Sequence, residues 1–434
     1  MVLRGELEQR FDVPFYLPKI LELENKIKSK SKQKLSHFIK YMASGSTPSV
    51  QEEEKYYSDK ANGIPFIRVQ NLNSTNDLSL EDLKYINTET HQNYLKRSRV
   101  EENDLLIKIT GVGRMAVASI APKGFIGNTN QHLVVIKTDN LETSLILATY
   151  LNTDIGEKLA TRRATGGTRP ALDYAALRSI PIVFLPETVE IIKNAVENKR
   201  EKEAEAQRLL LSIDDYLLEI LGITLPEVSS KEKVFRVCSN NVSGGRFDPF
   251  FYANQAYKIE GGIYENKSLR TVASLERGQS ITKDNIQSGA YPVIAGGQTS
   301  PYTHENFNQI GNVITVSASG AYSGYVWYHD YAIFASDCIV IKSKDETELT
   351  TKFLAEILKL KQKEIYNLQQ GSGQPHVYAS DLSKLMIPLP TPQKQNEILS
   401  HINNLRQRAQ DLATEAKNGL EVAKAAVESM ILGA

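Results

Sequence analysis

The sequence has only two cysteines and no apolar run long enough to cross a membrane. Cys238 and Cys338 stand far apart without metal-ligand partners, which excludes a disulfide-rich secreted scaffold. A membrane-spanning helix needs about 18 or more apolar residues in succession. The first residues also lack the basic-then-apolar pattern of a signal peptide. We therefore expect a cytoplasmic protein.

An excess of charge of either sign is also missing. The 434 residues include 51 basic and 51 acidic side chains, so the formal net charge is zero. This balance argues against a protein coated in positive charge, although a local basic patch is compatible with a neutral total. The length suits two or three domains, each large enough to bury a core.

The common signatures of catalysis are absent from the sequence. There is no glycine-rich phosphate loop ending in Gly-Lys-Ser/Thr, no dinucleotide fingerprint, and no Asn-Pro-Pro-Tyr or Asp-Pro-Pro-Tyr tetrapeptide of adenine methyltransferases. The seven histidines are dispersed, and no His-x-x-x-His or Cys-x-x-Cys pair offers metal ligands. We expect neither a catalytic centre nor a metal site in this chain.

Instead, the chain contains an internal duplication, because short segments return in the same order. The first pair is Arg10-Phe11-Asp12 and Arg246-Phe247-Asp248. The later pairs are Ile64-Pro65-Phe66-Ile67 with Tyr291-Pro292-Val293-Ile294, Val135-Ile136-Lys137 with Val340-Ile341-Lys342, and Thr165–Pro170 with Gln370–Pro375. Such self-similarity predicts two similar domains.

Two long helices are predicted, one after each repeat, because seam residues alternate in steps of three and four. The first seam is Val189, Ile192, Val196, Lys199, Glu203, Ala206, Leu210, Ile213, Leu217 and Ile220. The second is Ile398, Ile402, Leu405, Ala409, Leu412, Ala416, Gly419, Ala423, Ala426 and Met430. This period of 3.5 residues is typical of a coiled coil, and we expect the two helices to pack on each other as a rod of roughly 50–60 Å. The alternative is that each helix covers only its own domain.

The fold class we expect is α+β, with two similar mixed domains whose short strands form bent β-sheets. Helices are expected over 142–164 and 347–370. The expected organisation is an N-terminal segment (1–34), a first mixed domain (35–186), a central coiled-coil helix (187–221), a linker with the repeated Arg-Phe-Asp motif (222–259), a second mixed domain (260–392) and a C-terminal coiled-coil helix (393–434).

Loops in both repeats carry residue types that contact nucleic acid. Glycines let the backbone approach a phosphate closely, arginine reads guanine, and glutamine pairs with adenine, so we expect the two domains to prefer different bases. The candidate DNA-binding residues of the first domain are Arg68, Gln70, Lys108, Thr110, Gly111, Arg114, Arg162, Arg163, Gly166, Gly167, Thr168 and Arg169. Those of the second are Gln298, Ser317, Ser319, Tyr322, Gln370, Ser372, Gln374 and His376.

In these features the chain resembles the specificity (S) subunit of type I restriction-modification systems. The resemblance rests on the doubled Arg-Phe-Asp segment, on Lys108-Ile109-Thr110-Gly111, and on the glycine-rich loops before Ile180-Pro181-Ile182 and Ile387-Pro388-Leu389-Pro390. The segment from Pro390 to Ile398, which leads into the last helix, is also similar. This resemblance extends over nearly the whole chain, and it depends on the order and duplication of the motifs.

The resemblance implies a non-catalytic subunit that recognises a bipartite asymmetric site in double-stranded DNA. Residues 35–186 and 260–392 would then be its two target-recognition domains, each contacting one half of the site, with the two antiparallel helices between them. It also implies two methyltransferase (M) subunits and added restriction (R) subunits as partners. S-adenosylmethionine, ATP and Mg²⁺ would then belong to those partners, and this chain would hold no cofactor. Two other interpretations remain open: the specificity subunit of a related system whose partner fuses methyltransferase and nuclease, and a duplicated coiled-coil adaptor without a DNA role.

Overall fold

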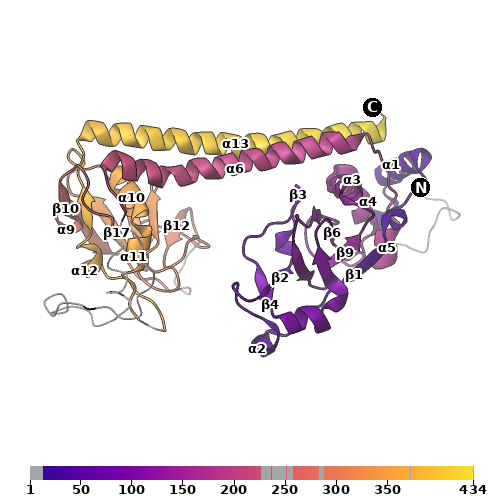
Figure 1. Cartoon of the computed structure of the whole chain (residues 1–434), viewed down its shortest axis with the longest axis horizontal. Helices are drawn as coiled ribbons and strands as arrows, with labels where there is room; N and C mark the ends of the chain where they lie inside the picture. Colours follow the sequence, from indigo (N-terminus) through magenta and orange to yellow (C-terminus); the bar gives the residue numbers. More distant parts are fainter. Residues whose placement is uncertain are drawn as a thin grey trace. The chain divides into compact units, whose positions relative to one another are not determined.

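The structure is a computed structural model that describes residues 13–225, 236, 251, 258–282, 288–371 and 373–433 (Figure 1). Both Arg-Phe-Asp segments lie outside these described residues. The described part of the chain divides into two compact units. The first unit contains the residues up to Glu205 and those from Asp411 onward, and the second contains Ala206–Gln410. Each unit holds one repeat.

Two small β-sheets form the centre of the first unit. Their strands are β1 (Tyr41–Ser44), β2 (Ile64–Ile67), β3 (Asn76–Asp77), β4 (Lys84–Ile86), β5 (Arg99–Glu101), β6 (Leu105–Lys108), β7 (Ala118–Ile120), β8 (Ile126–Thr129) and β9 (Leu133–Lys137). One sheet has the order β1-β9-β6-β7-β3, and the other has the order β4-β2-β8-β5.

The second unit is also built on small sheets. Its strands are β10 (Asn266–Ser268), β11 (Ala273–Arg277), β12 (Tyr291–Ile294), β13 (Thr303–His304), β14 (Val313–Ser317), β15 (Val326–His329), β16 (Phe334–Ala335), β17 (Cys338–Ser343) and β18 (Met386–Pro388). The sheet orders are β11-β17-β14-β15, β13-β12-β16 and β10-β18.

Strand pairing confirms the duplication predicted from the sequence. In the first unit β9 lies between antiparallel β1 and β6, and in the second β17 lies between antiparallel β11 and β14. Similarly, β2 pairs antiparallel with β4 and parallel with β8, whereas β12 pairs antiparallel with β13 and parallel with β16. The segments that repeat in the sequence therefore occupy equivalent strands.

Helices complete both units. They are α1 (Pro18–Lys30), α2 (Glu53–Tyr56), α3 (Leu141–Asn152), α4 (Asp154–Arg163), α5 (Tyr174–Arg178), α6 (Thr188–Leu221), α9 (Leu269–Val272), α10 (Thr351–Leu360), α11 (Gln362–Tyr366), α12 (Ala379–Leu382) and α13 (Pro392–Leu432). Short 3-10 or π turns cover Val13–Tyr16, Leu35–Phe38, Val50–Glu52, Val69–Asn71, Thr90–Tyr94 and Lys96–Ser98.

The single helix expected over 142–164 is two helices, because Thr153 has an extended backbone and begins α4. Its hydroxyl accepts a hydrogen bond from the Gly156 N–H at 3.2 Å, which is the usual role of threonine at a helix start. The helix expected over 347–370 is likewise divided into α10 and α11. Both pairs of helices lead toward a glycine-rich loop, as the sequence predicted.

The long helices α6 and α13 pack on each other in opposite directions, as predicted (Figure 1). In the first unit, Val196 near the start of α6 shares a core with Leu420 and Val427 near the end of α13. In the second unit, Leu217 near the end of α6 shares a core with Ile398 and Ile402 near the start of α13. Each buried valine, leucine or isoleucine contributes about 1.5–3 kcal/mol to folding.

The C-terminal seam differs from the prediction beyond Ala416. Gly419 and Met430 are exposed, while the neighbouring Leu420 and Ile431 are buried, together with Val427. Burial of the larger apolar side chain removes more surface from water, which favours this slightly rotated face. In α6 the predicted seam residue Leu210 is 48% exposed, and Leu209 is half-buried instead.

A buried ion cluster joins α1 to α4 in the first unit. The Glu24 carboxylate accepts hydrogen bonds from Arg162 and, at 2.7 Å, from Arg163, and all three side chains are buried. Arg162 also donates to the carbonyl of Phe15 at 2.7 Å. Burial would raise the pKa of Glu24, but the hydrogen bonds and charges of Arg163, Lys28 and Arg162 lower it from 4.5 to about 2. Glu24 is therefore a stabilising anion at neutral pH.

Replacing Glu24 with glutamine should lower the free energy of unfolding of the first unit by about 3 kcal/mol or more, because two buried guanidinium groups lose their counter-charge. In the unchanged protein this contribution is complete above about pH 4.5 and is lost as the pH falls toward about 2, since the folded-state pKa is depressed. Denaturant unfolding at several pH values measures both effects. Glu22→Gln, on the exposed side of the same helix, is the matched control, and equal loss in both variants would contradict the prediction.

Candidate nucleic-acid interface

The two glycine-rich loops predicted for the first repeat lie against each other. The Gly111 N–H, just after β6, donates to the Pro170 carbonyl at 3.1 Å. The Leu172 N–H donates to the Ile109 carbonyl at 2.8 Å, and Thr165 and Ala171 exchange two backbone hydrogen bonds. The loop after β6 and the loop after α4 therefore form one backbone-paired surface.

The second repeat reproduces this surface bond for bond. The Gly320 N–H, just after β14, donates to the Pro375 carbonyl at 3.0 Å. The Val377 N–H donates to the Ala318 carbonyl at 3.0 Å, and Gln370 and His376 exchange two backbone hydrogen bonds. Because the hydrogen bonds are made by backbone groups, the loops keep one geometry while their side chains differ.

Gly166 and Gly371 hold equivalent turns within these loops. Their φ angles are +97° and +98°, a region that favours glycine. A Cβ at Gly166 would lie 3.0 Å from the Arg169 carbonyl oxygen, and one at Gly371 would lie 2.8 Å from that of Gln374. Arg169 and Gln374 therefore occupy equivalent positions, three residues after the glycine of each tight turn.

Several predicted site residues are exposed in these loops. In the first repeat, Gly166, Gly167, Thr168 and Arg169 are all exposed. Within the described residues, no hydrogen bond or ion pair engages the side chains of Arg169 and Gln374. Tyr322 is 47% exposed. These side chains are available to a ligand, whereas Ser372 lies outside the described residues.

Arg162 and Arg163, two of the candidate DNA-binding residues predicted from the sequence, are buried and are not part of this surface. They end α4 and form the buried cluster with Glu24 described above. Removing either arginine would leave the buried Glu24 carboxylate with less compensating charge, which destabilises a fold. Both arginines therefore stabilise the first unit. Of these neighbouring arginine candidates, Arg169 is the exposed one.

Arg114 and Lys108 are partly or fully engaged inside the first unit. Arg114 forms an ion pair with Glu157 at 2.6 Å and donates to the Thr153 carbonyl at 2.6 Å. Lys108 is buried and donates to the Val112 carbonyl at 2.7 Å, and burial lowers its pKa. Both side chains stabilise the loop after β6. Gly111 contributes to this loop through its backbone N–H, which donates to the Pro170 carbonyl.

Arg68 and Gln70 follow β2 and are both held by Asp82. Arg68 donates to the Asp82 carbonyl at 2.9 Å, and Gln70 donates to the Asp82 carboxylate at 3.1 Å. Gln70 is exposed and Arg68 is half-buried. These residues could reach a ligand only if the contacts with Asp82 opened.

Most of the remaining second-repeat candidates also have partners. Ser317 donates to the Ala295 carbonyl at 3.3 Å, and Gln370 donates to the Asp381 carboxylate at 2.7 Å. Gln298 lies beside the Tyr366 hydroxyl and partly offsets the rise in the pKa of Tyr366 that burial causes. The ring of His376 lies 6.2 Å from that of Tyr378, which is itself 48% exposed. The structure thus brings together Ser319, Tyr322, Gln374 and His376 around one pair of loops.

Sequence reasoning missed two residues beside these loops, His132 and Asp337. Thr110 shares a hydrogen bond with the His132 imidazole Nδ1, and in the second repeat Ser319 donates to the Asp337 carboxylate. The signal that could have found them is their common position directly before β9 and β17. No motif marks either residue.

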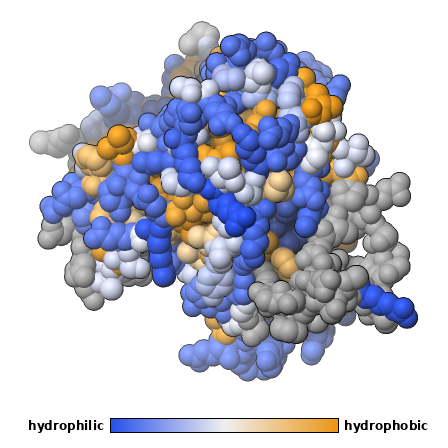
Figure 2. Space-filling model, turned by 90° about the vertical axis from the view of Figure 1, so that its left-hand side faces the viewer, coloured by the Kyte–Doolittle hydropathy of each residue, from blue (hydrophilic) through white to orange (hydrophobic). Residues whose placement is uncertain are grey.

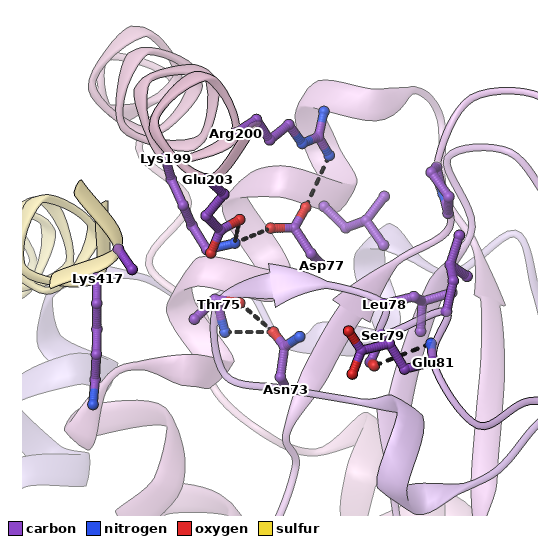
Figure 3. A pocket seen from close by; sticks show the side chains of 14 residues that line it. Asn73, Thr75, Asp77, Leu78, Ser79, Glu81, Lys199, Arg200, Glu203 and Lys417 are labelled. Carbon is purple, nitrogen blue, oxygen red and sulfur yellow. Dashed lines mark hydrogen bonds and ion pairs between the residues drawn. The ribbon is translucent and has the colours of Figure 1, made fainter. Parts of the chain in front are cut away.

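A cavity of about 730 Å³ also lies in the first unit, between β3, its neighbouring loop and parts of α6 and α13 (Figure 3). Lys199 there donates to Asp77 at 3.0 Å and to Glu203 at 2.8 Å, while Arg200 pairs with Asp77 at 2.9 Å. Burial would lower the pKa of Lys199, but these two carboxylates raise it. The charges balance, so this network joins β3 to α6 rather than forming an anion site.

Membrane-spanning helices and metal-binding clusters are both absent from the part of the chain that the structure describes. In the described ranges, no helix combines the length and the apolar character that crossing a membrane requires. Nor do the described residues contain a group of three or more histidine, cysteine or acidic side chains placed to hold a metal ion. On the face seen in Figure 2, hydrophilic residues predominate and hydrophobic ones form small separate groups.

The chain matches one protein family over most of its length. The family model described as the type I restriction modification DNA specificity domain matches residues 28–194 and again residues 263–422. A Mycoplasma genitalium protein named as a type I specificity subunit is 28% identical over 162 residues, which are 36% of this chain and 42% of that protein. A Mycoplasma pneumoniae protein of the same designation is 22% identical over 167 residues, 37% of this chain and 54% of that protein. The chain thus spans about half the length of these relatives.

Among solved structures, the chain resembles the S subunit of a type I restriction-modification system from M. genitalium. That likeness has a TM-score of 0.42 at 13% sequence identity and covers 93% of this chain and 94% of that one. The two family matches coincide with the two structural repeats and together cover more than half of the sequence. This chain therefore belongs to the family of type I restriction-modification DNA specificity domains, and it carries that domain twice.

Proposed function

We propose that this chain is the specificity subunit of a type I restriction-modification complex and recognises a bipartite, asymmetric site in double-stranded DNA. Each repeat would contact one half of the site. The chain would then direct two methyltransferase subunits, and restriction subunits added to them, to that DNA. Membership in a family of DNA specificity domains supports this function over that of an adaptor without a DNA role.

The observation that carries the proposal is the pair of equivalent loops with different exposed side chains. Arg169 and Gln374 occupy the same place after a glycine turn, and neither is engaged within the described residues. Arginine can donate two hydrogen bonds to guanine, whereas glutamine can pair with adenine. One backbone geometry would thereby present two chemistries, as an asymmetric site requires.

Catalysis and cofactor binding would reside in the partners. S-adenosylmethionine, ATP and Mg²⁺ are proposed for the methyltransferase and restriction subunits. Apolar side chains exposed on the long helices offer docking points: Leu210 and Leu211 on α6 in the second unit, and Val422 on α13 in the first. One such group in each unit fits two methyltransferase subunits.

Alone, the purified chain should transfer no methyl group to DNA. The reason is that its sequence carries neither a cofactor-binding nor a methyltransferase motif. Incubation with labelled S-adenosylmethionine and duplex DNA measures the transfer. Addition of a methyltransferase subunit should produce methylation, and transfer by the chain alone would contradict the proposal.

Replacing Arg169 with alanine should cost about 1–3 kcal/mol of binding if Arg169 reads a base, and should relax preference in one half-site only. If it contacts only phosphate, binding should weaken uniformly and the salt dependence should decrease. Binding of duplexes at several salt concentrations separates the two outcomes. Arg208→Ala removes an equal charge from an exposed position on α6 and serves as the control. Unchanged binding by the Arg169 variant would remove this loop from the interface.

Lengthening α6 and α13 together should change the gap between the half-sites and leave their sequences unchanged. One heptad inserted after Ala206, with a matching heptad after Gln410, keeps the seam in phase and adds roughly 10 Å to each helix. At about 3.4 Å per base pair, the preferred gap should grow by about three base pairs. Selection from a random-spacer library with the assembled complex measures the gap. An unchanged gap in a folded variant would show that the partner subunits set the spacing.

A further inference from the structure

One position in the two repeats combines an identical backbone setting with opposite side-chain chemistry. In the first repeat the Ile109 N–H donates to the His132 carbonyl at 3.0 Å, and in the second the Ala318 N–H donates to the Asp337 carbonyl at 3.2 Å. Thr110 and Ser319 then place a hydroxyl against the respective side chains. His132 and Asp337 therefore have the same backbone hydrogen bond and the same kind of neighbour, a hydroxyl group. They differ in that one side chain is an imidazole and the other a carboxylate.

Both side chains lie at the rim of the paired loops. His132 and Asp337 are half-buried, and each is tied through its neighbouring hydroxyl residue to the glycine-loop strand: Thr110 bridges to Ala171, and Ser319 bridges to His376. The Ser319 hydroxyl engages one oxygen of Asp337, and among the described residues no hydrogen bond reaches the other oxygen. Because Ser319 fixes the carboxylate, the second oxygen of Asp337 has a defined position, and among the described residues no group donates a hydrogen bond to it.

A carboxylate and an imidazole make opposite demands on a ligand. An ionised carboxylate only accepts hydrogen bonds, and it repels phosphate and carbonyl oxygens. In the major groove it can pair with an amino group, such as that of cytosine N4. An imidazole has one donor when neutral and two when protonated, so it tolerates an acceptor such as guanine N7 or O6.

We propose that Asp337 is a specificity-determining residue that selects a base bearing an exocyclic amino group, and that His132 occupies the corresponding place in the other half-site without that restriction. Ser319 is a positioning residue, since it fixes the carboxylate. This inference rests on the proposed function and adds to it a base-reading position outside the glycine loops.

The test is selection of preferred duplexes from a random library by the full-length chain assembled with its methyltransferase partner. Asp337→Asn keeps the size of the side chain but adds donors, so discrimination for an amino-bearing base should fall about tenfold or more at one position of one half-site. Ser319→Ala should weaken the same preference less. His132→Asp should impose an amino-group preference in the other half-site.

Asp330→Asn is the matched control, because Asp330 is exposed and lies at the opposite end of β14 and β15, beside Gly311. It removes the same charge and should leave both half-sites unchanged. Thermal unfolding confirms that each variant is folded, and Asp337→Glu tests the carboxylate in a variant that keeps its charge. If wild-type complex selects a sequence and Asp337→Asn selects the same one with equal discrimination, this inference is wrong. If the wild-type complex selects no sequence, the proposed function itself fails.

Discussion

Everything that the two repeats present to a ligand depends on backbone hydrogen bonds between two loops. The Gly111 N–H donates to the Pro170 carbonyl, and the Gly320 N–H donates to the Pro375 carbonyl. Both donors have positive φ angles, +121° and +87°, which favour glycine, but the exposed side chains of the loops take no part in these bonds. Since they leave the exposed side chains unconstrained, substitutions there need not disturb the sheets beneath. The sheets in turn place the loops, because β6 and β14 lead directly into them.

The two units use charge in different ways below this surface. In the first unit, Glu24 forms ion pairs with Arg162 and Arg163, which precede the glycine loop. In the second, the buried Lys361 pairs with Glu364 at 3.0 Å on α11, while Arg406 of α13 pairs with the buried Glu356 of α10 at 2.6 Å. Equivalent backbones thus rest on different ionic supports, which shows that the repeats have diverged inside as well as outside.

Features that are duplicated or periodic in the sequence could be predicted from it. Contacts between side chains that are far apart along the chain could not. The duplicated strands and the 3.5-residue period located both units and both long helices. The fate of Arg162 could not be predicted, because its partner Glu24 lies in a different helix. Periodicity also could not decide between Gly419 and Leu420, since adjacent residues fall within one helical stripe. His132 and Asp337 carry no motif, and only the paired backbones reveal them as equivalents.

The first unit is discontinuous in the chain, and this imposes an order on its synthesis. Val189, Ile192 and Val196 emerge from the ribosome long before Leu420, Val427 and Ile431, with which they share a core. At about 5–20 residues per second, that delay is of the order of ten seconds or more. During that time the apolar stripe of α6 lacks the α13 residues that complete its core, and apolar surface exposed in this way attracts chaperones. A product truncated before α13 would contain the strands of both repeats but would leave this core of the first unit incomplete and open to proteolysis.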